Sequence, residues 1–120
     1  MRTGLAALLA LVAPGATAAP ASAARYHGCM AESSGCQHRF VAGDLPIARF
    51  QDASGRRTRV SVCVRDSEGT RCWRSRRPRK RFGFVTQIIK YRTGGAHLTT
   101  WRVRGKVVAR WHWRLVPEPE

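Results

Sequence analysis

The sequence predicts an all-β domain of six to seven short antiparallel strands, arranged as a small β-sandwich or a partly open barrel. Apolar and polar residues alternate along several segments, which is the period of half-buried strands. Turn signals rich in Gly, Asp and Ser recur about every ten residues along the same part of the chain. No segment there has the apolar period of a helix.

The first 23 residues are expected to be a secretory signal peptide. Arg2 precedes an apolar run from Leu5 to Val12, and small residues with Ala-x-Ala cleavage sites follow, the second ending at Ala23. The run is too short for a stable membrane-spanning helix. Removing residues 1–23 takes away one of the 22 basic residues, so the net charge falls from +15 to +14. We therefore expect a secreted, extracellular, strongly basic chain.

About 97 residues then remain, enough for one core. Residues 24–44 are predicted to be an irregular, disulfide-stapled N-terminal extension, because small and polar residues surround its two cysteines. Phe40-Val41 is its expected contact with the core. The β-sandwich domain proper is expected to span residues 45–116, and residues 117–120 should form a disordered tail.

The first expected strand covers residues 45–51 and ends at a turn. Asp52-Ala53-Ser54-Gly55 has Asp at the first and Gly at the fourth position of a type I turn. If that turn closes a hairpin, Ile47 lies opposite Val60 and the apolar faces of the two strands match. We therefore expect residues 45–51 to pair with the strand that follows.

The segment from Val60 to Trp73 predicts a hairpin from two independent features. Its valines alternate with other residues, and Asp66-Ser67-Glu68-Gly69 repeats the turn pattern. If Asp faces Gly across this turn, Cys63 lies opposite Cys72 on one face and Val62 opposite Trp73 on the other. One face of the hairpin would carry a disulfide, and the other would pack its apolar side chains.

Four cysteines in a short exported chain predict two disulfides. The hairpin selects Cys63–Cys72, which leaves Cys29–Cys36, and each bond would contribute about 2–3 kcal/mol. The alternative is a metal site, because one His stands two residues before Cys29 and another two residues after Cys36. Zinc ligands usually have wider spacing within a pair and exported cysteines favour disulfides, so no metal is predicted.

Residues 74–81 predict an exposed basic loop. Six of these eight residues are cationic, and Pro78 interrupts any ladder of hydrogen bonds. Residues 82–91 follow as a strand with apolar side chains on both faces, which predicts a central position in a sheet. Thr93-Gly94-Gly95 is the next turn.

The last third of the chain predicts a final hairpin. A plain two-residue turn at Arg104-Gly105 would place Trp101 beside the basic face of the last strand. A bulge or a three-residue connection near this turn avoids that register. We expect the extra residue, with Trp101 opposite Ala109 and Val103 opposite Val107.

The ending TTWRVRGKVVARWHWRL resembles the terminal strand pair of small secreted immunoglobulin-like β-sandwich proteins of high-GC Gram-positive bacteria. The shared feature is the spacing Trp-x-Val-x-Gly-x-x-Val-x-x-Trp, within the last third of the chain. The resemblance implies an immunoglobulin-like architecture and no defined activity. The chain departs from true immunoglobulin domains because the Cys…Trp…Cys arrangement is absent and His97 stands where a corner Tyr is expected.

The basic loop is the strongest functional signal, since eleven of the 22 basic residues lie between Arg56 and Arg81. Such a patch would bind polyanions by releasing counterions, without sequence specificity. Outside a cell these would be teichoic acids, anionic lipid surfaces, nucleic acid or polyphosphate. The alternative is a solvated loop that only keeps the protein soluble. The candidate binding residues are Arg74, Arg76, Arg77, Arg79, Lys80 and Arg81.

No catalytic or cofactor motif is present, so we expect a non-enzymatic binding domain without cofactors. Only seven carboxylates remain after the signal peptide, and five of them fall in predicted turns or the tail. Few carboxylates are therefore available for a catalytic dyad or for a Ser/His/Asp triad. The sequence also lacks a Gly-rich phosphate loop and a nucleophile elbow.

The aromatic residues of the final hairpin allow two interpretations. Trp101, Trp111 and Trp113 could stack on sugar rings, but their place on one strand face fits a hydrophobic core better. His97 and His112 are expected near each other across the hairpin, as surface residues rather than a catalytic pair.

A second functional class is a secreted protease inhibitor or protein-interaction module. Small secreted β-domains with two disulfides often present a rigid loop to a protease, and an Arg-rich loop would suit a trypsin-like pocket. Residues 76–81 are not held between disulfides, which ranks this class below polyanion binding.

Overall fold

Nine β-strands form two sheets in the computed structural model, which describes residues 25–33, 35–81 and 83–117. The strands are β1 (Tyr26–Glu32), β2 (Gly35–Cys36), β3 (Arg39–Val41), β4 (Ile47–Asp52), β5 (Val60–Asp66), β6 (Gly69–Arg76), β7 (Val85–Ile88), β8 (Gly95–Val103) and β9 (Lys106–Val116). One sheet has the order β2-β1-β4-β7 and the other β3-β9-β8-β5-β6. The all-β class is confirmed. The expected signal peptide, 1–23, and residues 118–120 of the expected tail lie outside the described residues.

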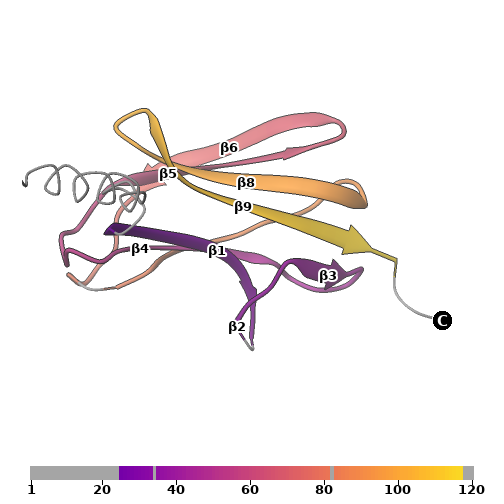
Figure 1. The fold of residues 1–120 in the computed structure, drawn as a ribbon, viewed down its shortest axis with the longest axis horizontal. Helices are drawn as coiled ribbons and strands as arrows, with labels where there is room; N and C mark the ends of the chain where they lie inside the picture. Colours follow the sequence, from indigo (N-terminus) through magenta and orange to yellow (C-terminus); the bar gives the residue numbers. More distant parts are fainter. Residues whose placement is uncertain (1–24, 34, 82, 118–120) are drawn as a thin grey trace, which may run out of the picture.

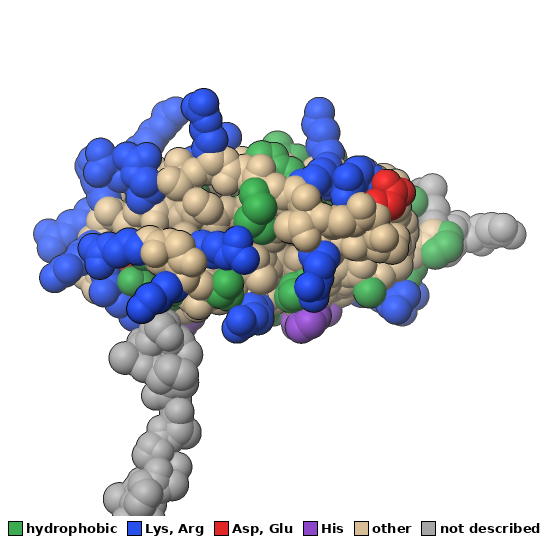
Figure 2. All heavy atoms as spheres, turned by 90° about the horizontal axis from the view of Figure 1, so that it is seen from above, with side chains coloured by type: hydrophobic (Ala, Val, Ile, Leu, Met, Phe, Trp, Pro, Cys, Tyr) green, Lys and Arg blue, Asp and Glu red, His purple; other side chains and the backbone are tan. Residues whose placement is uncertain are grey.

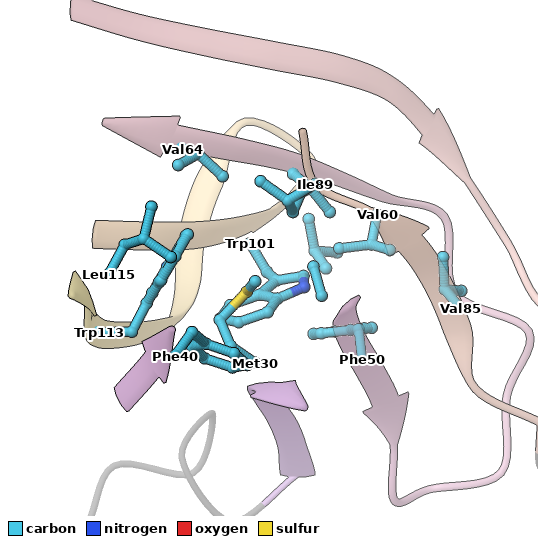
Figure 3. Close-up of a cluster of buried hydrophobic side chains, with 13 residues drawn as sticks. Met30, Phe40, Phe50, Val60, Val64, Val85, Ile89, Trp101, Trp113 and Leu115 are labelled. Carbon is cyan, nitrogen blue, oxygen red and sulfur yellow. The ribbon is translucent and has the colours of Figure 1, made fainter. Parts of the chain in front are cut away.

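The two sheets lie one above the other, with β5, β6, β8 and β9 over β1 and β4 (Figure 1). The core fills the space between them (Figure 3). Trp101 of β8 is fully buried at its centre and faces Met30 and Phe50 of the other sheet. Trp113 meets Phe40 edge to face, with ring centroids 5.4 Å apart. Burial of these large side chains is the main force that holds the layers together.

The prediction of six to seven strands is wrong, and the N-terminal segment is the reason. Residues 45–116 hold six strands, whereas residues 24–44, expected to be irregular, contribute β1, β2 and β3. Strand β1 pairs antiparallel with β4 and buries Met30. Its pattern was hidden by Gly28, where a Cβ would lie 2.7 Å from Cε3 of Trp101. This glycine therefore marks a close approach to the core rather than a loop. The expected core contact of Phe40 is confirmed.

The predicted pairing of residues 45–51 with the following strand is also wrong. The Asp52 turn does form, because Gly55 N donates to Asp52 O at 3.0 Å. However, Ile47 pairs with Ala31 and Ile88, and residues 53–59 cross from one sheet to the other. Matching apolar faces occur both in a hairpin and in strands that face each other across a core. The alternation of side chains could not separate these cases.

The hairpin of β5 and β6 is confirmed, with the predicted register. Cys63 pairs with Cys72, and Val62 pairs with Trp73. The disulfides are Cys63–Cys72 and Cys29–Cys36, as predicted. The first links β5 to β6, and the second links β1 to β2.

Strand β7 lies at the edge of its sheet, not at the centre as predicted. Its apolar residues on two faces have different environments, since Ile89 just after it is buried while Ile88 is 51% exposed. In the β8–β9 hairpin, the expected bulge is present and Trp101 pairs with Ala109. Arg104 and Gly105 keep a two-residue turn with positive φ angles, so Val103 pairs with Lys106 instead of Val107.

Candidate functional site

The topology gathers cationic side chains at one end of the molecule, which we call the basic end. The antiparallel registers bring Tyr26 beside Asp52, Val60 beside Arg76, and Val103 beside Lys106. The ends of six strands and the turns between them therefore meet here. Figure 2 shows Lys and Arg side chains densest at the left of the face that it presents, with acidic side chains near the right.

A cleft of about 370 Å³ opens at the basic end, and we call it the arginine cleft. Tyr26, Thr58, Ser61 and Ser75 line it together with arginines. Guanidinium groups make a rigid fork that matches phosphate oxygens, and the hydroxyl groups of Ser61 and Ser75 are further hydrogen-bond donors at the cleft. The arginines that line the cleft are Arg25, Arg56, Arg57, Arg59, Arg102 and Arg104.

Arg25 differs from the other five because it is neutralised within the fold. Its guanidinium binds the Asp52 carboxylate through two contacts of 2.9 Å, and Ser54 and Thr58 also donate to that carboxylate. Burial by itself would raise the pKa of Asp52, but the hydrogen bonds outweigh it and hold the pKa well below its usual range. The five other arginines form no ion pair with any residue that the structure describes. Their charges therefore face solvent without a counterion from this part of the protein.

The predicted basic loop lies next to the arginine cleft, although it begins later than expected. Arg74 and Arg76 belong to β6, and both are exposed. The exposed loop cations Arg77, Arg79 and Lys80 line a second hollow, of about 460 Å³, which we call the loop hollow. Since β6 supplies Ser75 to the cleft and Arg76 to the hollow, the two cationic surfaces meet at the end of this strand.

The basic loop has fixed points. Pro78 is buried, and Gly83 N donates to Lys80 O at 3.1 Å in a turn. Arg81 Nε donates to Gly55 O at 3.1 Å, which ties the loop to the segment that carries Arg56 and Arg57. Arg81, predicted to bind polyanions, therefore also holds the loop in place.

Sequence reasoning missed the cleft arginines as a group. The density of basic residues from position 56 onward was a signal for Arg56, Arg57 and Arg59. Arg102 and Arg104 carried no such signal, because only the pairing of β5 with β8 brings them to the same place.

The tryptophans divide between the core and the surface. Trp101 and Trp113 are buried, as the core interpretation predicts, while Trp111 is half-buried and donates from Nε1 to Gln37 O at 2.9 Å. The two histidines do not face each other, because His97 pairs with Trp113 and His112 with Leu98. His97 is buried and stacks on Trp113, so its predicted surface position is wrong.

Within the described ranges, no three His, Cys, Asp or Glu side chains lie close enough to hold a metal ion. All four cysteines are bonded in the two disulfides. Asp52 and Asp66 are both occupied by ion pairs with arginine. In the part of the chain that the structure covers, no helix is long and apolar enough to cross a membrane.

No known protein family matches the sequence, and no curated protein matches it. Among solved structures, the chain is similar to the Pseudomonas fluorescens alkylpurine DNA glycosylase AlkC bound to DNA containing an abasic site analog. The identity is 12% and the TM-score 0.47, and the match covers 88% of this chain and 33% of that one. The chain thus spans about a third of the length of that enzyme. A likeness at this level assigns neither a family nor an activity.

Proposed function

We propose that the protein is a secreted, non-enzymatic domain that binds anionic polymers without sequence specificity. One observation carries the proposal: guanidinium groups from separate chain segments converge on one cleft, and among the described residues a carboxylate pairs with Arg25 alone of this group. Like charges at this density repel one another, so they weaken the folded state unless a ligand neutralises them. A phosphate-rich polymer supplies that neutralisation.

The binding surface in this proposal consists of the arginine cleft and the basic loop. Arg102 enters it from β8, Arg104 from the β8–β9 turn, and Arg57 and Arg59 from the crossing segment. Arg76 to Lys80 enter it from the end of β6 onward. Each phosphate that binds releases condensed counterions, so affinity falls as salt rises. Extracellular ligands with this chemistry are teichoic acids, anionic lipid surfaces, nucleic acid and polyphosphate. Two disulfides fit the expected export of the chain.

The test compares three variants that each remove four positive charges. The cleft variant is Arg57→Gln, Arg59→Gln, Arg102→Gln and Arg104→Gln. The loop variant is Arg76→Gln, Arg77→Gln, Arg79→Gln and Lys80→Gln. The control variant changes exposed cations away from the basic end: Arg39→Gln, Arg65→Gln, Lys90→Gln and Arg114→Gln. Because net charge is matched, only the position of the charges differs.

Polyphosphate binding is measured from about 20 to 500 mM salt, a range over which binding to phosphates separates clearly from other interactions. The slope of log affinity against log salt should become shallower by roughly 0.7–0.9 for each phosphate that the cleft and loop variants no longer neutralise. The control variant should keep a slope close to that of the wild type. An equal loss in all three variants would show attraction by net charge alone and would contradict the proposal. A pull-down from the cell envelope that retained one protein partner at high salt would favour the protein-interaction or inhibitor class.

An immunoglobulin-like topology belongs to the same proposal. Variable-type immunoglobulin domains place strands G, F, C and C′ side by side in one sheet and A, B and E in the other. The orders β9-β8-β5-β6 and β1-β4-β7 support that correspondence. Here each disulfide stays within one sheet, and Trp101 occupies the centre of the core between the sheets.

A further inference from the structure

Phe84 forms a wall shared by two hollows of different chemistry. It lines the loop hollow together with Arg76, Arg77 and Arg79. It also lines a separate hollow of about 360 Å³, which we call the aromatic groove. Phe84 is 47% exposed, although burial of such a side chain would be favourable. The aromatic groove is lined by His27, Gly28, Cys29, Cys36, Arg49, Gln51, Phe84 and Trp111.

Phe84 and Trp111, two of the rings that line the aromatic groove, are held in place by contacts within the fold. The Arg49 guanidinium lies over the Phe84 ring, 4.3 Å from its centroid. Trp111 is fixed by the hydrogen bond from Nε1 to Gln37 O, and the His38 ring stacks on it at 3.9 Å with 7° between the planes. Fixed rings lose little conformational entropy when they bind, which favours stacking.

We infer that the polymer bound at the basic end is a single-stranded nucleic acid whose bases stack in the aromatic groove. This inference rests on the proposed function. The phosphates meet the cations of the loop hollow, and the unstacked bases pass Phe84 into the groove beside Trp111. Cationic surfaces next to aromatic platforms are the arrangement that binds single strands without sequence preference, because every base has a flat face.

The other candidate polyanions use only half of this surface. Polyphosphate, the polyol-phosphate backbone of teichoic acids and anionic lipid surfaces have no flat aromatic rings, so Phe84 and Trp111 would contribute little to their binding. A DNA duplex keeps its bases stacked inside, where protein rings reach them only by unstacking. A neutral glycan can stack on both rings, yet it leaves the cations of the loop hollow unused. Only a flexible chain that carries a ring with each phosphate uses both hollows.

The test uses Phe84→Ala with Ile88→Ala as its matched control. Ile88 is another large apolar side chain near the same edge strand and is 51% exposed, but it does not line either hollow. The probes are an oligodeoxythymidylate of twelve nucleotides, a duplex of the same length, polyphosphate, and a neutral chitin oligosaccharide. Phe84→Ala should weaken oligodeoxythymidylate binding about tenfold, the effect of losing one stacked base. It should leave polyphosphate affinity and the salt slope unchanged, and Ile88→Ala should leave all four affinities unchanged.

A second readout follows Trp111 directly. Stacking of a base should quench tryptophan fluorescence in the wild type when the oligonucleotide binds, and Trp111→Phe should remove most of that quenching while keeping a ring in the groove. Polyphosphate should cause no quenching in either protein.

Three outcomes would overturn the inference. Unchanged oligonucleotide affinity in Phe84→Ala would exclude stacking on this ring. An equal loss of polyphosphate affinity would show that Phe84 only supports the loop. A loss confined to the chitin oligosaccharide would assign the groove to neutral glycans. In each of these cases the proposed function is decided separately, by the salt slopes of the cleft and loop variants.

Discussion

Both ends of the molecule bury one aspartate and pair it with one arginine, and at the basic end five further arginines also line one cleft. At the basic end Asp52 binds Arg25, and at the far end, beside the β5–β6 turn, Asp66 binds Arg92, each at 2.9 Å. Both carboxylates are almost fully buried. One arginine is thus enough to neutralise the buried carboxylate at each end of the fold. The further arginines of the cleft have no comparable role in the fold, which supports a role in binding.

Removing the buried carboxylates should have the largest effect on stability. Asp52→Ala is expected to lower the free energy of unfolding by about 3 kcal/mol, because Arg25, Ser54 and Thr58 all lose their acceptor. Asp66→Ala should cost less, about 2 kcal/mol, since the groups that donate to it are the Arg92 guanidinium and the Glu68 backbone. Urea unfolding at pH 7 measures both.

The control for these variants is Glu68→Ala, which removes an exposed carboxylate next to Asp66 and should change stability by less than about 0.5 kcal/mol. If either aspartate variant matched this control, the buried ion pair at that end would have no structural role.

The next effect in size is the loss of stability in acid. Hydrogen bonds hold the pKa of both aspartates below the unfolded value of about 3.9, although burial alone would raise it. A carboxylate with a depressed pKa contributes its full stabilisation above the unfolded pKa and loses it as pH falls through the folded pKa. The free energy of unfolding should therefore fall below about pH 4. Urea unfolding between pH 2 and 6 should show a shallower fall for Asp52→Asn with Asp66→Asn. An equally steep fall in this double variant would assign acid sensitivity to other carboxylates.

The sequence predicted local features of this fold well and failed on contacts between distant segments. The β5–β6 hairpin followed from one turn and one alternating strand, both contained in fourteen residues. Its register then gave the disulfide pairing. Strand β4 shows the opposite case, because its neighbours β1 and β7 lie on either side in the sheet and no turn joins it directly to either. Strand β1 was missed because Gly28, which allows the close approach of Trp101, looks like a loop residue.

The candidate site also has one part that the sequence predicts and other parts that depend on contacts between distant segments. The basic loop was visible as a run of cations, and the structure places it at the surface. The arginine cleft was not visible, since Arg102 meets Ser61 only through the pairing of β8 with β5. The aromatic groove combines Phe84 with Trp111, which come from different parts of the chain and have no sequence pattern in common. Only the topology brings them together.

The smallest expected effect is a change in melting temperature. It distinguishes the unpaired cleft arginines from an arginine that neutralises a buried carboxylate. Arg57→Gln with Arg104→Gln should raise the melting temperature by about 1–2 °C at low salt, because it relieves repulsion in the cleft. The gain should vanish at about 500 mM salt, where charges are screened over a few ångströms. Arg92→Gln should instead lower the melting temperature at both salt concentrations, because it leaves the buried Asp66 carboxylate without its cation. Differential scanning calorimetry at the two salt concentrations measures all three proteins. A lower melting temperature at low salt for the double variant Arg57→Gln with Arg104→Gln would mean that these arginines stabilise the fold. The contrast between the two ends would then no longer indicate a binding site.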